Sequence, residues 1–310
     1  MTTAYITHPD CLKHQMFTGH PECPERLIAI EDRLKGEQLW DFLEHIEAVD
    51  AKDGDLLLSH SQELLDNLHK DSPEAGEPLY HVDPDTYMNE HTLGAALKSA
   101  GAGTMAVDLV MQKKIDNAFC SVRPPGHHAE RNEAMGFCFF NNIAVAAAYA
   151  LEKYSLDRVA IIDFDVHHGN GTEEIFHNDP RVLICSSYEH PMYPYSGCES
   201  IPGHIVNSQL SPGSTGVEFR QAVEKEWLPE LEAFKPEFVF ISAGFDAHKE
   251  DVMAELQFSD SDYLWVSQKI KEVAEKHADG RLISMLEGGY ALNALARSTE
   301  QHIRVLMGLE

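Results

Sequence analysis

Short apolar runs alternate along the chain with longer stretches in which apolar residues recur at helical spacing. Short runs rich in β-branched side chains predict buried strands, because parallel strands covered on both faces carry apolar residues throughout. The predicted strands are residues 4–7, 118–122, 158–163, 182–187, 238–243 and 281–286. The predicted helices between them include residues 93–112, 142–153, 216–234 and 260–277.

This alternation predicts an α/β fold, a single domain with a mostly parallel central sheet and helices on both faces. The chain has 310 residues, of which 43% are hydrophobic and 24% charged, which is enough for a large core. We therefore expect one domain over residues 1–310. Segment 71–85 is rich in proline and acidic residues, and we expect it to be a long surface loop.

The net charge of -27 argues against binding to a nucleic-acid backbone, which needs clustered lysine and arginine. The charge favours cationic partners, and the alternative is that the acidity serves solubility alone. The most apolar stretch, residues 143–151, is about half of the ~20 residues that a membrane span needs. We expect neither nucleic-acid nor membrane partners.

The cysteines are scattered and form no C-x-x-C pair. They are Cys11, Cys23, Cys120, Cys138, Cys185 and Cys198. Without regular spacing, they indicate neither a disulfide framework nor a structural zinc knuckle. A reducing compartment fits this pattern, so we expect a cytoplasmic protein.

Polar clusters follow four of the predicted strands. They are residues 123–128, 163–170, 244–246 and 287–290. Because ligands of open parallel sheets bind beyond the carboxyl ends of the strands, these four segments are expected to meet at one edge of the sheet.

Asp163, Asp165 and His167 alternate where the chain leaves a predicted strand, so their side chains should point to the same side. Charged groups at the end of an apolar strand are costly unless they are paired or bind a metal, and Asp246 follows another strand. Asp165, His167 and Asp246 together predict a catalytic zinc site with an open position for water. Iron(II) is an alternative occupant, and a solvated loop or an ion-pair network is the alternative to a metal site.

Two histidines, His127 and His128, follow the rigid turn Pro124-Pro125-Gly126. Beside a metal-bound water, one imidazole can take a proton and a histidine can return one to the leaving amine. Asp163 and Asn170 are the candidate partners that orient the two rings. The alternative is a pair of surface histidines.

Tyr290 follows two glycines, whose backbone freedom suits a side chain that moves over the metal. Its phenol is a candidate donor to the oxyanion that develops during hydrolysis. The alternative is a tyrosine that only caps a turn.

These motifs resemble those of the histone deacetylases, the arginase-like zinc deacetylases, and especially their class II and bacterial branch. The matching segments are residues 20–27, 123–128, 136–142, 163–171, 243–246 and 287–290. The resemblance implies that an acylated lysine or a small acylated amine enters a narrow tube. Water then hydrolyses its amide to a short acid and a free amine.

The resemblance also implies substrate-binding residues. Phe137 and Tyr193 would flank the acyl chain, Gly136 would accept a hydrogen bond from the substrate amide, and Arg26 would lie near an internal acetate channel. Potassium is a second implied cofactor. Its ligands would be Asp163, Asp165, His167, Ser186 and Ser187, with a second site around Phe176, Asp179 and Val182.

The chain departs from the family pattern at Asn170, where class I members carry aspartate. An amide stabilises a neighbouring imidazolium less than a carboxylate does, so His128 is expected to stay neutral as a base. The proline that usually follows Asp251 is also missing, which leaves the shape of the loop at 247–256 open.

Polyamine-selective relatives place a glutamate seven residues beyond the metal-binding aspartate. Met253 stands there and favours acyl-lysine over acetylpolyamine, unless Glu255 turns inward. A manganese-dependent ureohydrolase is disfavoured because a second bridging aspartate is missing beyond Asp246. A metal-dependent binding module without activity is a further alternative function. A homo-oligomer is a possible state of the chain.

Overall fold

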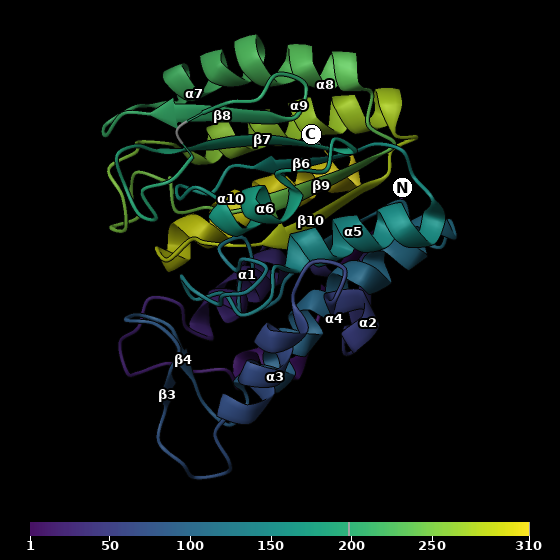
Figure 1. Ribbon diagram of the computed structural model, residues 1–310. Helices are drawn as coiled ribbons and strands as arrows, with labels where there is room; N and C mark the ends of the chain where they lie inside the picture. Colours follow the sequence, from purple (N-terminus) through teal and green to yellow (C-terminus); the bar gives the residue numbers. More distant parts are fainter. Residues whose placement is uncertain (198, 310) are drawn as a thin grey trace.

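The computed structural model describes residues 1–197 and 199–309. Within these residues an eight-stranded sheet forms the centre, in the order β2-β1-β5-β10-β9-β6-β7-β8, and all neighbouring strands are parallel (Figure 1). The strands are β1 (Thr3–Thr7), β2 (Glu44–Glu47), β5 (Asn117–Cys120), β6 (Val159–Asp163), β7 (Val182–Glu189), β8 (Ile205–Leu210), β9 (Phe238–Ala243) and β10 (Leu282–Leu286).

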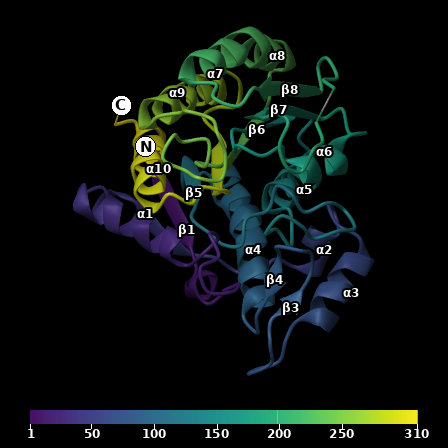
Figure 2. The same cartoon turned by 90° about the vertical axis from the view of Figure 1, so that its left-hand side faces the viewer.

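Helices cover both faces of the sheet (Figure 2). One face carries α1 (Glu25–Gly36), α7 (Gly216–Ala222), α8 (Leu228–Phe234), α9 (Asp260–His277) and α10 (Leu292–Met307). The other carries α4 (Thr92–Met111) and α5 (Asn142–Tyr154), with α2 (Asp53–Leu56), α3 (Gln62–Asp71) and α6 (Asn170–Phe176) further out. The predicted single-domain α/β architecture is confirmed, and no helix in the described residues is long and apolar enough to cross a membrane.

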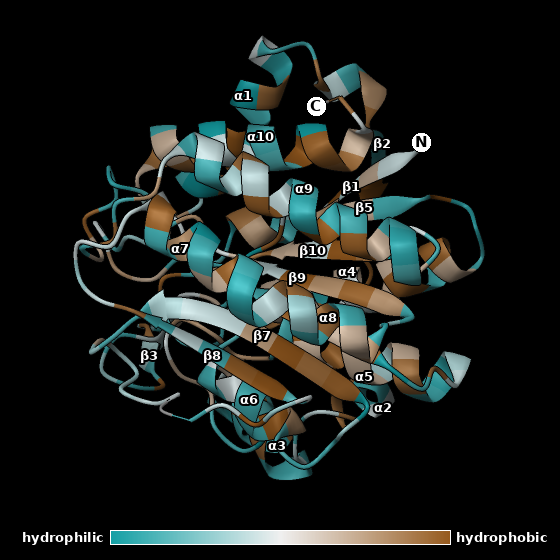
Figure 3. Cartoon of the chain, turned by 90° about the horizontal axis from the view of Figure 1, so that it is seen from above, coloured by the Kyte–Doolittle hydropathy of each residue, from teal (hydrophilic) through white to brown (hydrophobic). Residues whose placement is uncertain are grey.

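All six strands predicted from apolar runs exist, and β5, β6, β9 and β10 are buried at every residue. Figure 3 shows apolar residues along the strands and polar residues on the outward faces of the covering helices. Two further strands, β2 and β8, lie at the edges of the sheet and were not predicted. Both carry polar residues, which are tolerated at an edge but hide the strand pattern.

Two details of the prediction need correction. The segment 71–85 is not only a loop, because it contains β3 (Tyr80–His81), which pairs with β4 (Tyr87–Met88) in a small antiparallel hairpin. The helix expected over 216–234 is interrupted by a π-helical turn, Val223–Trp227. Pro229 follows that turn, and a proline ring cannot join a regular helical hydrogen-bond ladder.

The four strands followed by polar clusters are neighbours, in the order β5-β10-β9-β6. Because they are parallel, their carboxyl ends lie at the same edge, where all four clusters emerge. Five of the six cysteines are free thiols, and Cys198 lies outside the described residues.

Candidate metal centre and active site

Asp165, His167 and Asp246 converge beyond β6 and β9, as predicted. Their ligand atoms all lie within 4.8 Å of one another, and all three side chains are buried. His167 Nδ1 is 3.0 Å from Asp165 Oδ1 and 3.3 Å from Asp246 Oδ2. This group could hold a metal ion.

Glycine backbone surrounds the two carboxylates. A Cβ atom at Gly244 would lie 2.1 Å from Asp165 Oδ2, and one at Gly288 would lie 2.0 Å from Asp246 Oδ2. The amide of Gly288 also donates to Asp165 Oδ2 over 2.8 Å. Only glycine allows the chain to pass this close, which gives the glycines of these segments a steric function.

The electrostatics of this group suit a cation. Burial, together with the charge of Asp165, raises the pKa of Asp246 to about 6. Burial opposes charge on His167, but its hydrogen bond to Asp165 and the nearby Asp246 carboxylate raise the pKa of the imidazole to about 10. Asp246 Oδ2 accepts no hydrogen bond from the described residues. A buried carboxylate oxygen without a donor is expensive, and a divalent ion would supply its missing partner.

The two histidines of the 123–128 segment lie side by side, with ring centroids 4.1 Å apart. His127 Nδ1 is 2.9 Å from Asp163 Oδ2, and His128 Nδ1 is 2.8 Å from Asn170 Oδ1. Asn170 Nδ2 donates to Glu130 Oε1, which leaves Oδ1 to face His128 as an acceptor. Both predicted pairings are present in the structure.

The two imidazoles have opposite preferences for charge. Burial opposes charge on His127, but the Asp163 and Asp165 carboxylates raise its pKa well above the usual value. Burial lowers the pKa of His128 well below the usual value, and charge on His127 and His167 lowers it further. His127 is therefore disposed to be an imidazolium and His128 a neutral base.

Glu287 orients the histidine segment and was not assigned this role from the sequence. Its Oε2 accepts hydrogen bonds from the backbone amides of Gly126 at 2.7 Å and His127 at 3.1 Å. Burial raises the pKa of this carboxyl to about 7, although the charge of His127 opposes the rise.

A cavity of about 190 Å³ lies beside His128 and His167. It is lined by Asp85, His128, Gly136, Phe137, His167, Met192, Tyr193, Met253 and Tyr290. The Phe137 and Tyr290 rings stand perpendicular at 6.1 Å, and Tyr193 lies 5.3 Å from the His128 ring. Four of the five predicted substrate-binding residues thus line the same cavity as His128 and His167, whereas Asp85 and Met192 were missed.

Gly136 needs a glycine conformation. Its φ is +58°, and a Cβ there would lie 2.7 Å from His128 Cδ2. Its carbonyl oxygen, the predicted acceptor for a substrate amide, accepts from Cys138 Sγ over 3.3 Å. Its amide donates to Asp83 Oδ2.

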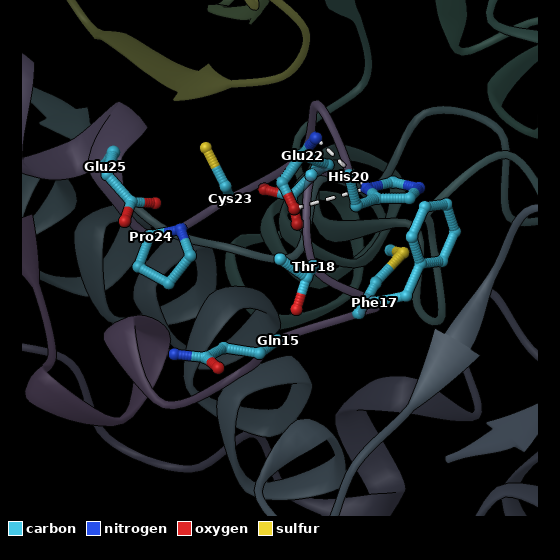
Figure 4. A pocket seen from close by; sticks show the side chains of 10 residues that line it. Gln15, Phe17, Thr18, His20, Glu22, Cys23, Pro24 and Glu25 are labelled. Carbon is cyan, nitrogen blue, oxygen red and sulfur yellow. Dashed lines mark hydrogen bonds between the residues drawn. The ribbon is translucent and has the colours of Figure 1, made fainter.

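Arg26 does not line the cavity. It is fully buried, donates to the carbonyl oxygens of Gly289 and Glu287, and lies 5.0 Å from the centroid of the Tyr290 ring. It also donates to Glu22, whose segment lines a second cavity of about 230 Å³ (Figure 4). Arg26 thus supports the backbone beside Tyr290, and a channel there stays a prediction.

The expected potassium ligands lie next to the metal group. Asp163 in β6 pairs with Ser186 in β7, and the hydroxyls of Ser186 and Ser187 are buried without a hydrogen-bond partner among the described residues. At the second expected site, the Asp179 amide donates to the Phe176 carbonyl and the Val182 amide to the Asp179 carbonyl.

The rim loop, residues 247–256, is closed by backbone hydrogen bonds at its base, from Lys249 to Phe258 and from Phe258 to Ala247. Val252, which replaces the usual proline, is 94% exposed. Met253 lines the cavity, whereas Glu255 is exposed and its amide donates to Glu189.

With this geometry established, comparison with known proteins identifies the class. The sequence profile of the histone deacetylase domain matches residues 20–306. A probable deacetylase of Archaeoglobus fulgidus is 36% identical over 94% of this chain and 82% of its own length. The histone deacetylase-like amidohydrolase of Pseudomonas aeruginosa is 36% identical over 88% of this chain and 73% of its own length.

The mouse polyamine deacetylase HDAC10 is 35% identical over 99% of this chain, which covers 48% of that protein. The crystal structure of the HDA15 HD domain superposes with a TM-score of 0.93 at 34% identity, covering 99% of this chain and 88% of that one. The chain belongs to the histone deacetylase family, whose fold it shares. It is a hydrolytic deacetylase enzyme.

Proposed function

We propose that the chain hydrolyses N-acetyl-lysine or a related acylated amine with a single zinc ion held by Asp165, His167 and Asp246. The observation that carries this proposal is the buried Asp246 Oδ2, which accepts no hydrogen bond and lies 3.3 Å from Nδ1 of His167, a residue that lines the cavity together with His128 and Tyr290. Among the described residues one group of three ligand side chains lies this close, which favours one metal ion over a binuclear manganese site. Iron(II) is the alternative occupant, because oxygen and nitrogen ligands do not select zinc alone.

Held by Asp165, His167 and Asp246, a metal ion would polarise the substrate carbonyl and lower the pKa of a bound water to roughly 7. His128 takes the proton of that water on Nε2, because its Nδ1 proton is engaged with Asn170. The charged His127, oriented by Asp163, stabilises the negative charge that develops. Tyr290 donates its phenol to the oxyanion, and His128 returns its proton to the leaving amine.

Phe137 and Tyr193 form the walls for the acyl chain, and Gly136 offers its carbonyl to the substrate amide. The unpartnered hydroxyls of Ser186 and Ser187, beside Asp163, support a potassium ion next to the metal.

An acetylpolyamine is the second candidate substrate, because the Asp85 carboxylate lines the cavity and would attract a distal ammonium. Met253 argues for acyl-lysine, since an apolar side chain at the rim gives such an ammonium no partner.

The experiment is an assay of metal-depleted and zinc-reconstituted protein against acetyl-lysine peptides, longer acyl-lysines and acetylspermidine. Turnover that returns with one zinc per chain and is fastest for acetyl-lysine supports the proposal. Two tightly bound ions per chain, or no turnover of any acyl-amide by the reconstituted protein, would contradict it.

A further inference from the structure

The carboxylate of Asp251 is 6% exposed and accepts three backbone hydrogen bonds. Its Oδ2 accepts from the amides of Tyr290 at 2.6 Å and Ala291 at 2.9 Å, and its Oδ1 accepts from Met253 at 3.1 Å. Tyr290 and Met253 both line the cavity. One side chain therefore joins the candidate oxyanion donor to the rim loop.

The peptide bond between Gly289 and Tyr290 lies between two opposite charges. Its carbonyl accepts from Arg26 Nε at 2.7 Å, and its amide donates to Asp251. A peptide unit is planar, so fixing both its oxygen and its hydrogen fixes the orientation of the whole unit. Gly289 has a φ of +119°, so the residue before Tyr290 adds conformational freedom rather than restraint. The two charged side chains thus determine the direction in which the Tyr290 side chain leaves the backbone.

We propose that Asp251 is a positioning residue, which holds the Tyr290 phenol where it can donate to the oxyanion. This inference rests on the proposed function, because it assumes that Tyr290 is that donor. The simpler explanation is that Asp251 only caps α10, which begins at Leu292 directly after the two amides it binds. A carboxylate at a helix N-terminus would contribute stability without affecting the reaction.

The two explanations differ in how Asp251→Ala combines with Tyr290→Phe. If Asp251 acts through Tyr290, Asp251→Ala lowers kcat about 10- to 100-fold, as removal of orienting partners does elsewhere. In the Tyr290→Phe background the same change then lowers kcat by less than about 3-fold, because residues that act as a unit are not additive. The zinc content stays within about 2-fold of the wild-type value, since no metal ligand is changed, and KM changes less than kcat because Asp251 holds only the backbone amide of Met253.

Asp251→Asn serves as the conservative variant. Its amide oxygen can still accept from the Tyr290 amide, so it should retain most of the kcat that Asp251→Ala loses, and it remains informative if Asp251→Ala does not fold. Two control variants are matched to it. Glu250→Gln removes the adjacent charge on the same loop, where Glu250 pairs with Arg297. Ser259→Ala removes the N-terminal cap of α9. Both should keep wild-type kcat, and Ser259→Ala should lower the melting temperature.

Multiplicative losses in the double variant, or a fall in melting temperature at unchanged kcat, would overturn the inference and leave Asp251 as a cap. Failure of the proposed function looks different. In that case wild-type protein with zinc has no turnover, or Tyr290→Phe alone leaves kcat unchanged.

Discussion

Nδ1 of His128 and Oδ1 of Asn170 are 2.8 Å apart, and the Asn170 amide group is fixed by its own bond to Glu130. The pair leaves Nε2 as the free nitrogen of His128, and Nε2 is the atom that must accept a proton from water. Asn170 orients this base without adding a charge to it.

The first prediction follows from this pair. His128→Ala should lose more activity than Asn170→Ala, because the first removes the base and the second only its orientation. We expect Asn170→Ala to lower kcat about 10- to 100-fold, as the loss of a residue that orients a catalytic side chain does elsewhere. Steady-state kinetics of both variants measure this. Equal and mild losses would mean that another group activates the water.

The second prediction concerns the metal. Asp246→Ala and His167→Ala should lose both bound zinc and activity while keeping the fold, because each removes one of three ligands. His168→Ala is the matched control, since its ring nitrogens contact Ser196 and Glu173 instead of the ligand group. Elemental analysis and far-UV circular dichroism provide the measurements. Stoichiometric zinc with normal turnover in Asp246→Ala or His167→Ala would remove that residue from the ligand set.

Third, Tyr290→Phe keeps the ring and removes only the donor. Loss of one oxyanion donor typically costs about 10²- to 10³-fold in rate, so kcat should fall by that factor with little change in KM. Tyr195→Phe, which changes an exposed tyrosine two positions after the cavity residue Tyr193, should behave as wild type. A large rise in KM at constant kcat would instead make Tyr290 a binding residue.

Fourth, Met253 should influence the choice of substrate. Wild-type protein should favour acetyl-lysine peptides over acetylspermidine in kcat/KM, and Met253→Glu should narrow the gap by giving the distal ammonium a partner. Val252→Glu is the control, because it adds the same charge to a side chain that is 94% exposed, where solvent screens it. A wild-type preference for acetylspermidine that disappears in Glu255→Gln would refute the assignment of Met253.

The fifth prediction links pH to stability through His60. Burial lowers the pKa of His60 to about 4, and its Nε2 accepts from the Asn141 amide at 2.8 Å. The unfolded chain binds this proton near pH 6.5 but the folded chain does not. The contribution of neutral His60 to the free energy of unfolding is therefore complete above pH 6.5. It decreases as the pH falls toward 4, by up to roughly 1.4 kcal/mol per pH unit.

Chemical unfolding at pH 7 and pH 5 measures this loss. His60→Gln should show a smaller loss than the wild type, because glutamine does not titrate. His69→Gln should show the wild-type loss, since the His69 side chain is exposed and the change leaves His60 in place. Equal pH dependence in the wild type and His60→Gln would contradict the prediction.

The buried centre of the sheet and the ligand group could be predicted because both depend on local sequence. Strands such as β6 and β9 are buried at every residue and apolar except for Asp163 and Ser242, and the polar clusters follow them directly. Asp251 could not be assigned in this way, since it acts on an amide 39 positions away. Glu287 contacts Gly126 across 161 positions. Asp85 reaches the cavity from a segment whose composition indicates only a loop.

Among the described strands β10 is the last along the chain, yet it lies in the middle of the sheet, between β5 and β9. Until it inserts, the strands made earlier can form only two separate groups, β2-β1-β5 and β9-β6-β7-β8. During synthesis β10 is the last of these strands to be made, so the segments that follow β5, β9 and β6 belong to one continuous sheet only once β10 has joined the two groups. Recovery of activity should report the completion of folding rather than its beginning, and the contacts that limit it are among the most distant in the sequence.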